Sequence, residues 1–240
     1  MHILITRAEP AASRTAMALH DLGYRPFVFP LSEVVDTGHE MPVSNFDGYV
    51  FTSSNAVRIL KSRGWNCGER EIVAYCVGDR TADAANSLGF SQTVSSGGNA
   101  ENLAELIRME GEKRPLRLAY PAGVQRSFDI EGVLAGSAVE VETVEIYEVK
   151  SIIPPPSEIE KLFSKLGSGI VLLYSHNTAK HVCDVLFGRA GRKLAHRFSV
   201  IAISTKTAEA VLKYPWQDVY VADEPTEQSM VMKLNQLSHK

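Results

Sequence analysis

The sequence has no long hydrophobic run. None of its apolar stretches reaches the roughly 18 to 20 residues that span a bilayer. Residues 1–7 also lack the long apolar core of a secretory signal peptide. Cysteine is scarce, since Cys67, Cys76 and Cys183 are widely spaced and form no paired motif, which indicates neither a disulfide framework nor a structural zinc site. We therefore expect a cytoplasmic protein without a membrane partner.

An excess of positive charge is also missing. Lys and Arg number 25 against 28 Asp and Glu, for a formal net charge of -3, whereas nucleic-acid binding needs a basic footprint. The chain has no glycine-rich dinucleotide fingerprint, no P-loop and no metal-ligand cluster. We expect no nucleic-acid partner, no metal and no cofactor, and any anionic ligand must be held by local geometry.

What is present is a composition, 45% hydrophobic and 22% charged, that is typical of a globular protein. Short runs of Ile, Val and Leu alternate with segments of helical period, which favours βαβ units and mainly parallel sheets. Five strands in each of two domains would suit a flavodoxin-like α/β fold. The predicted strands are residues 2–6, 25–30, 48–52, 72–77, 92–94, 116–120, 139–149, 170–174, 199–203 and 218–221.

An internal repeat is the most informative positive feature. Residues 51–56 (FTSSNA) return at 174–179 (YSHNTA), and residues 77–82 (VGDRTA) return at 203–208 (ISTKTA). Each copy reads as a strand, a small polar turn and a helix. Ligands of open α/β sheets bind at the carboxyl ends of the strands, where helix N-termini offer free N–H groups. Two such edges facing each other would form a cleft for a large anionic ligand.

The pattern allows two ways of assembling the repeats. The predicted strand at 139–149 is long enough to bridge domains, and Pro154, Pro155 and Pro156 form a stiff segment after it. Either each half of the chain is one domain, or the N-terminal βαβ unit pairs with the C-terminal strands. The pattern alone does not decide between these arrangements.

Small polar residues at the predicted strand ends are candidates for ligand binding. Ser53, Ser54 and Asn55 open a predicted helix, and Ser175 matches them in the second copy. Each has helix capping as an equally good explanation, because Ser and Asn are preferred N-caps. His176 is a single histidine for which the sequence identifies no catalytic or metal-binding partner, so it is interpreted as a packing or surface residue.

Thr81 and Thr207 occupy matching positions, where capping is the safer interpretation. Asn99 is a predicted N-cap of the helix that begins at residue 100. Gly78 is expected to permit a close backbone approach or an unusual turn, a role that Ser204 could fill only with a more restricted backbone.

Cations near the strand ends are expected to pair with acidic groups of a ligand. Arg7 and Arg126 lie in comparable regions of the repeated βα segments and are the first candidates, because bidentate arginine pairing suits carboxylates. Tyr147 lies in the long strand, and strict alternation would place it on one face with Val139 and Val141. On pattern alone, packing is the better explanation for this tyrosine.

An ordered set of motifs resembles the uroporphyrinogen-III synthase family along nearly the whole chain. The set consists of residues 52–57 (TSSNAV), 77–82, 98–103 (GNAENL), 126–134 with Gly136, 144–147 (VEIY), 202–208 (AISTKTA) and 225–226. The chain departs from the family pattern at Ser204, where glycine is expected, and around His176.

For the fold, this resemblance implies two flavodoxin-like parallel-sheet domains joined by a two-strand connector, with the N-terminal βαβ unit exchanged. The outer domain would hold residues 1–33 and 151–240, the central domain residues 37–147, and the connectors would lie near 34–36 and 148–150. For the activity, it implies cofactor-free cyclisation of hydroxymethylbilane, a linear tetrapyrrole with eight carboxylates, to uroporphyrinogen III with inversion of the last ring and loss of water.

The resemblance raises Tyr147 to the candidate acid that protonates the departing hydroxyl. The implied substrate-binding positions are Arg7, Ser53, Ser54, Asn55, Gly78, Thr81, Asn99, Gly123, Arg126, Ser175 and Thr207. A monomer is expected. The rival hypothesis is a non-catalytic two-domain module that binds or senses an anionic small molecule, which turnover of the substrate would distinguish.

Overall fold

A computed structural model describes residues 1–42, 45–68, 72–188 and 195–238. The chain divides into two compact units, of which unit 1 comprises Met1–Glu33 and Lys150–Lys240 and unit 2 comprises Val34–Val149. Within the described ranges, no helix combines the length and the apolar character needed to cross a membrane.

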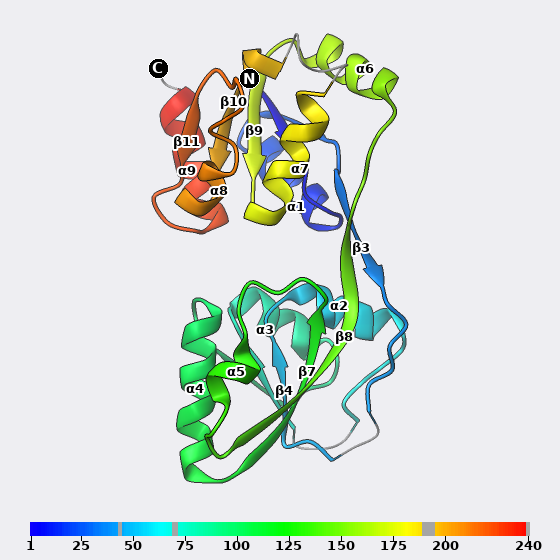
Figure 1. Cartoon of the computed structure of the whole chain (residues 1–240), viewed down its shortest axis with the longest axis vertical. Coiled ribbons are helices and arrows are strands. Elements are labelled where there is room, and N and C mark those ends of the chain that lie inside the picture. Colours follow the sequence, from blue (N-terminus) through cyan, green and yellow to red (C-terminus); the bar gives the residue numbers. More distant parts are fainter. Residues whose placement is uncertain (43–44, 69–71, 189–194, 239–240) are drawn as a thin grey trace. The chain divides into compact units, whose positions relative to one another are not determined.

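Unit 1 is built on a parallel sheet in the order β11-β10-β9-β1-β2. Its strands are β1 (His2–Ile5), β2 (Arg25–Val28), β9 (Gly169–Leu173), β10 (Phe198–Ala202) and β11 (Val219–Val221). Its helices are α1 (Ala11–Asp21), α6 (Pro156–Leu166), α7 (His176–Leu186), α8 (Thr205–Glu209) and α9 (Glu227–Ser238), with a short 3₁₀ helix at Ala195–Arg197. The N-terminal strands therefore share a sheet with the C-terminal ones (Figure 1).

Unit 2 has the sheet order β3-β8-β7-β4-β5-β6, in which the strands from β8 to β6 are parallel. Its strands are β3 (Ser32–Asp36), β4 (Gly48–Phe51), β5 (Val73–Cys76), β6 (Gln92–Ser95), β7 (Leu116–Gly123) and β8 (Val139–Ser151), of which β3 and β8 extend past the unit boundary. Its helices are α2 (Ser54–Ser62), α3 (Asp79–Asn86), α4 (Ala100–Lys113) and α5 (Ile130–Leu134).

Each sheet is covered on both faces by helices, which explains why its central strands read as continuous apolar runs. Ile3, Leu4 and Ile5 in β1 are all fully buried. Leu4 packs in one core cluster with Phe163 of α6, whereas Ile3 and Ile5 pack on the other face with Leu19 of α1. Unit 2 has the same two-sided arrangement around β4 and β5.

The five strands of the unit 1 sheet follow the same order as five of the six strands of the unit 2 sheet. Replacing β1, β2, β9, β10 and β11 by β7, β8, β4, β5 and β6 converts the first sheet into the strands β8 to β6 of the second, which has β3 as a further strand beside β8. Both follow the flavodoxin-like order, which confirms the predicted α/β fold with two parallel sheets. The first two strands of each sequence repeat pair with the last three strands of the other repeat.

The sequence pattern missed one strand and misplaced the end of another. β3 is absent from the strands that the pattern predicted, although the resemblance implied a connector strand near residues 34–36; it completes the sheet by hydrogen bonding to β8, a contact that local sequence does not encode. β7 was expected to stop at residue 120 and instead continues to Gly123. Pro121 is tolerated because β4 pairs with β7 only at Leu118 and Ala119, so the missing N–H lies beyond that pairing.

Strict alternation along β8 was the wrong expectation for Tyr147. Ala122 of β7 pairs with Glu145, but Gly123 pairs with Tyr147, so Ile146 is an extra residue in a β-bulge. Val139 and Val141 pack on one face of the sheet, whereas Tyr147 packs with Phe51 on the other. A bulge re-aims the side chains that follow it, and here it turns Tyr147 to the α2 side of the sheet.

Candidate functional site

The candidate site of unit 2 lies at the carboxyl-terminal edge of its sheet. β4, β5 and β7 are parallel and end at Phe51, Cys76 and Gly123, so the residues that follow them emerge at one edge. β8 runs past this edge and carries Tyr147 beside Gly123. Four of the predicted site residues, Ser53, Gly123, Arg126 and Tyr147, are thereby brought together.

Tyr147 lies directly against the backbone of Gly123. A Cβ atom at Gly123 would stand 2.7 Å from Cζ and 2.9 Å from the hydroxyl oxygen of Tyr147. Any residue other than glycine would therefore push the ring away. This close approach gives Gly123 a structural role that the sequence alone did not reveal.

The side chain of Ser53 lies close to the hydroxyl of Tyr147 and lowers the pKa of the phenol. Ser53 is the N-cap of α2, and its Oγ accepts the backbone N–H of Asn55 at 3.1 Å. The capping explanation is thus confirmed for Ser53. Because the capping oxygen acts as an acceptor, its own hydroxyl hydrogen remains available for donation to a neighbouring acceptor.

Burial dominates the electrostatics of Tyr147, whose exposed fraction is only 8%. It raises the pKa of the phenol above its ordinary value of 10, while the nearby Ser53 side chain and the positive charge of Arg126 act in the opposite direction. The phenol is therefore protonated through the neutral range and can act as a proton donor.

A second hydroxyl pair, not anticipated from the sequence, supports this arrangement. The hydroxyl of Tyr120 in β7 lies 2.8 Å from Oγ1 of Thr52, the residue before Ser53. Burial raises the pKa of Tyr120 as well. The pair ties the end of β4 to β7, and only the pairing of β4 with β7 brings Tyr120 to Thr52.

Arg126 is held by groups of its own unit. Its Nη1 donates to the carbonyl oxygen of Gly123 at 2.9 Å and to Oε1 of Glu145 at 2.8 Å. Gly123 and Glu145 flank Tyr147 in the sheet register, so Arg126 bridges β7 and β8 beside it. The guanidinium is partly exposed and contributes positive charge to the site.

Arg63 fixes the strand that carries Tyr147. The residue follows α2 and forms a bidentate ion pair with Asp36 of β3, while its Nη1 donates to the carbonyl of His39. The carbonyl oxygen of Ile146, in the bulge, accepts hydrogen bonds from the N–H of Thr37 at 3.1 Å and from Nη2 of Arg63 at 3.4 Å. The Arg63 side chain therefore joins α2, β3 and β8 next to Tyr147.

The remaining predicted residues of unit 2 lie at helix starts along the edge. Asn99 caps α4, and its side chain accepts the N–H of Asn102 at 2.8 Å, which confirms the predicted cap. Ser54 and Asn55 are the first residues of α2. The capping interpretation is wrong for Thr81, because the N-cap of α3 is Gly78 and Thr81 is a buried residue within the helix whose N–H donates to the carbonyl of Gly78 at 2.9 Å.

Gly78 does not form the unusual turn expected of it. Its φ of -166° and ψ of 166° are extended values that any residue adopts, and a Cβ atom added there would meet no other atom within 4 Å. Ser204 has nearly the same backbone, with φ -154° and ψ 162°, and its Oγ accepts the N–H of Thr207 at 3.3 Å. Glycine and serine are therefore both compatible with this N-cap.

The matching edge of unit 1 contains Ser175, His176 and Thr207. Ser175 occupies the N-cap position of α7 but makes no side-chain capping bond. Nδ1 of His176 lies 2.7 Å from the carbonyl oxygen of Lys206, joining the starts of α7 and α8. The hydroxyl of Thr207 lies 3.1 Å from that of Ser204, so Thr207 contacts the cap rather than forming it.

Arg7 follows β1 and packs on Tyr174, which follows β9. The guanidinium carbon lies 4.0 Å from the centre of the Tyr174 ring, a cation–π arrangement. Nη1 of Arg7 also lies 3.5 Å from Oε1 of Glu227, the first residue of α9. Neither Tyr174 nor Glu227 was singled out from the sequence, because their proximity depends on the sheet pairing.

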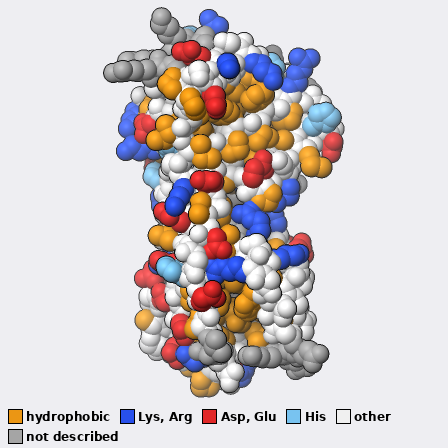
Figure 2. All heavy atoms as spheres, turned by 90° about the vertical axis from the view of Figure 1, so that its right-hand side faces the viewer, with side chains coloured by type: hydrophobic (Ala, Val, Ile, Leu, Met, Phe, Trp, Pro, Cys, Tyr) orange, Lys and Arg blue, Asp and Glu red, His pale blue; other side chains and the backbone are white. Residues whose placement is uncertain are grey.

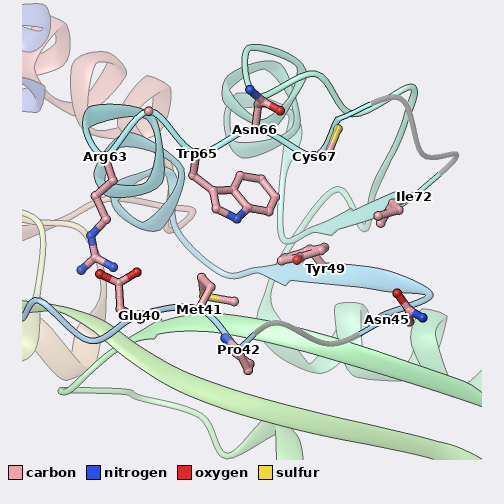
Figure 3. Close-up of a pocket in the computed structure, with 11 residues that line it drawn as sticks. Glu40, Met41, Pro42, Asn45, Tyr49, Arg63, Trp65, Asn66, Cys67 and Ile72 are labelled. Carbon is pink, nitrogen blue, oxygen red and sulfur yellow. The ribbon is translucent and has the colours of Figure 1, made fainter.

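A separate pocket opens at the opposite edge of the unit 2 sheet. Its lining includes Asn45 and Tyr49 at the start of β4 and Ile72 just before β5 (Figure 3). The rings of Trp65 and Tyr49 border the hollow, and the Arg63 side chain points towards Glu40. This pocket extends from the amino-terminal ends of β4 and β5 to Arg63, and Tyr147 is not among its lining residues.

Charges of both signs share the surface. On the face drawn in Figure 2, Lys and Arg side chains lie among Asp and Glu side chains rather than in one block. Among the described residues, no group of three or more His, Cys, Asp or Glu side chains is arranged to hold a metal ion.

The fold and the site define a class: an α/β protein with two mainly parallel sheets that share a five-strand order and carry hydroxyl and arginine side chains at their carboxyl edges. The family model described as uroporphyrinogen-III synthase HemD matches residues 13–232. The chain therefore belongs to the uroporphyrinogen-III synthase family, which confirms the resemblance found in its motifs.

Individual relatives are distant. The chain is 25% identical over 252 aligned positions to the porphyrin biosynthesis protein HemD of Ruminiclostridium josui, covering 97% of this chain and 47% of that protein. It thus spans about half the length of this curated relative. The crystal structure of uroporphyrinogen-III synthetase from Helicobacter pylori 26695 is similar with a TM-score of 0.66 at 20% identity, covering 98% of this chain and 99% of that one. At this identity the similarity shows a shared fold.

Proposed function

We propose that this protein is a uroporphyrinogen-III synthase, a lyase that cyclises hydroxymethylbilane to uroporphyrinogen III. The observation that carries the proposal is the Tyr147 hydroxyl, which is protonated, lies near Ser53 and Arg126 and is held against Gly123 at the carboxyl edge of the sheet. Family membership supplies the reaction class. The protein would act without a cofactor, as a monomer in the cytoplasm.

Tyr147 would supply the proton for the first step. The carbon–oxygen bond of the hydroxymethyl group breaks as the phenol protonates the oxygen, which leaves as water. Ser53 and Arg126 stabilise the tyrosinate that forms, because both act to lower the pKa of Tyr147. The phenol is re-protonated when the last pyrrole ring loses its α-hydrogen, so the net change is loss of one water molecule.

The rest of the reaction depends on the conformation of the bound substrate. The electron-poor carbon left by water is attacked by the substituted α-carbon of the last ring, which gives a spiro intermediate. The older bond of that ring then breaks and re-forms at the other α-carbon, so the ring closes inverted. An enzyme contributes here by holding the reacting carbons in one geometry, which can account for much of its rate enhancement.

Binding would use donors spread along the sheet edges. In unit 2 these are the α2 start at Ser53, Ser54 and Asn55, the Gly78 and Thr81 turn, Asn99, and Arg126 beside Gly123. In unit 1 they are Arg7, Ser175 and Thr207. Backbone N–H groups at helix N-termini and arginine side chains both suit carboxylates. We further propose that residues 1–33 and 151–240 act as one domain and residues 37–147 as the other, joined near 34–36 and 148–150.

The decisive experiment is to add purified protein to freshly made hydroxymethylbilane and to separate the product isomers. Uncatalysed closure gives the uninverted type I ring, so type III product reports the enzyme. We expect type III uroporphyrinogen to predominate. Type I alone, formed at the uncatalysed rate, would contradict the proposal and favour a protein that binds the anion without converting it.

A further inference from the structure

One carboxylate oxygen in unit 1 accepts three hydrogen bonds. Oε1 of Glu227 receives the hydroxyl of Thr15, the hydroxyl of Tyr174 at 3.4 Å and Nη1 of Arg7 at 3.5 Å. Arg7 and Thr15 also contact each other at 3.5 Å. Three donors from separate elements therefore converge on one point, which a carboxylate fills.

The convergence lies where α/β sheets bind ligands. Arg7 and Tyr174 follow β1 and β9, which are parallel neighbours, so they leave the sheet at its carboxyl edge. Thr15 projects from α1, and Glu227 is the first residue of α9. Tyr174 in unit 1 holds the same place, next to the N-cap serine, as Thr52 in unit 2.

The donors are more firmly held than the acceptor. Thr15 is buried, the Arg7 side chain is only 19% exposed, and its guanidinium is stacked on Tyr174. The Glu227 side chain is 37% exposed. A partly exposed ion pair of this kind contributes little to stability. A glutamate leaving the pair would remain in the first turn of α9, where the helix dipole favours a negative charge.

We propose that Arg7, Thr15 and Tyr174 form a carboxylate-binding site, which Glu227 occupies until a ligand carboxylate replaces it. The ligand class is a polyanion with flexible carboxylate side chains. Its identification as the tetrapyrrole substrate rests on the proposed function. Glu227 is then an internal competitor, and it keeps the three donors paired when no ligand is bound.

The exchange is chemically balanced because one carboxylate replaces another. Burial and the neighbouring charge of Glu227 raise the pKa of Tyr174 to about 12, so its hydroxyl stays protonated and can donate to either carboxylate. No bond other than hydrogen bonds is made or broken, and the net charge around Arg7 is the same before and after.

A double-mutant cycle tests the proposal. Four proteins are compared: the parent, Glu227→Gln, Arg7→Gln and the double variant. The measured quantity is the Kd for uroporphyrin III, the stable oxidised form of the proposed product, from quenching of its fluorescence. Glu227→Gln should bind about two- to fivefold more tightly, the range for one partly exposed charge pair. This gain should vanish in the double variant, which should match Arg7→Gln.

Matched variants distinguish competition by Glu227 from a general effect of removing negative charge and from a loss of folding. Glu160→Gln removes an equal charge from an exposed position of α6 in the same unit and should leave the Kd unchanged. Glu227→Asp keeps the charge but shortens its reach, and should give a smaller gain. If Glu227→Gln does not fold, the Glu227→Asp measurement decides: a Kd equal to or weaker than that of the parent overturns the proposal.

Two results with folded Glu227→Gln would overturn the inference. One is a Kd that is unchanged or weaker, which would make Glu227 a purely structural partner. The other is a gain that persists without Arg7. Isomer analysis of the parent protein tests the enzymatic assignment separately. If the parent forms type III product but Glu227→Gln gives no gain in affinity, only the proposed role of Glu227 is rejected. If the parent forms no type III product but the four Kd values follow the expected pattern, only the enzymatic assignment is rejected.

Discussion

Tyr147 depends on residues that are remote from it in sequence. Ser53 lies close to its hydroxyl, Gly123 makes room for its ring, and Arg126 brings positive charge. Sequence patterns could nominate the polar turn at Ser53 and, through the family resemblance, Tyr147. They could not predict the Tyr120–Thr52 contact, nor that position 123 must be glycine to make room for the Tyr147 ring. Both follow from the pairing of β4, β7 and β8.

Removal of the Tyr147 hydroxyl tests its role as the acid. Tyr147→Phe keeps the ring against Gly123, so the melting temperature should change little. Turnover to type III should fall by up to about 10²- to 10⁴-fold, the usual contribution of a general acid, and type I product should replace it. Tyr24→Phe, which removes the hydroxyl bonded to Asn235 in unit 1, is the matched control and should stay active. Unchanged rate and isomer ratio in Tyr147→Phe would make the residue a packing tyrosine.

The two glycines of the unit 2 edge should respond differently to a methyl group. Gly123→Ala places a Cβ 2.7 Å from the Tyr147 ring and should displace it, lowering both the melting temperature and the fraction of type III product. Gly78→Ala meets open space at an extended backbone and should leave the melting temperature unchanged. Thermal unfolding of both variants, together with isomer analysis of Gly123→Ala, checks this. Equal stability of the two would show that Tyr147 readily moves aside.

At the scale of elements, β3 and the bulge in β8 determine where Tyr147 points. Helix starts were predictable because capping residues act locally, as at Asn99. The strand β3 and the change of face at Ile146 were not, since neither leaves a signal within its own segment. Arg63 ties these elements together through Asp36 and the carbonyl of Ile146. Because this connection includes the Arg63–Asp36 ion pair, its contribution to the stability of the fold depends on pH.

The Arg63–Asp36 pair should lose its stabilising effect on the fold at strongly acidic pH. The Arg63 guanidinium lowers the pKa of Asp36 from 3.8 to about 2. The unfolded chain therefore binds a proton at higher pH than the folded one, so this stabilisation is complete above about pH 4 and is lost as the pH falls towards 2. Asp36→Asn should be less stable than the parent at pH 6, and the difference should be clearly smaller at pH 2.5, where part of the stabilisation has been lost. Urea unfolding at both pH values measures this, and a constant difference would contradict it.

For the whole molecule, the reciprocal pairing of the two repeats sets which segments share a core. The repeat itself was readable from the sequence, and so was the parallel α/β class. The choice between continuous and exchanged halves was not, because strands from either half are apolar enough to fill either sheet. In the structure β1 pairs with β9, and residues of both surround the same buried side chains, including Phe198.

Core cavities should therefore loosen segments that are distant in sequence. Phe198 is fully buried in unit 1, and Phe198→Ala should cost about 3 to 5 kcal/mol. Hydrogen exchange should then speed up in β1 and β2 as well as in β9, β10 and β11, because all five strands lose the support of one core. Strands β4 to β7 should keep their protection. Leu103→Ala, which opens a cavity in unit 2, is the reciprocal control and should give the opposite pattern. If β1 kept its protection while β9 to β11 lost theirs, the N-terminal strands would be stabilised independently of the C-terminal core, and the assignment of residues 1–33 and 151–240 to one domain would be wrong.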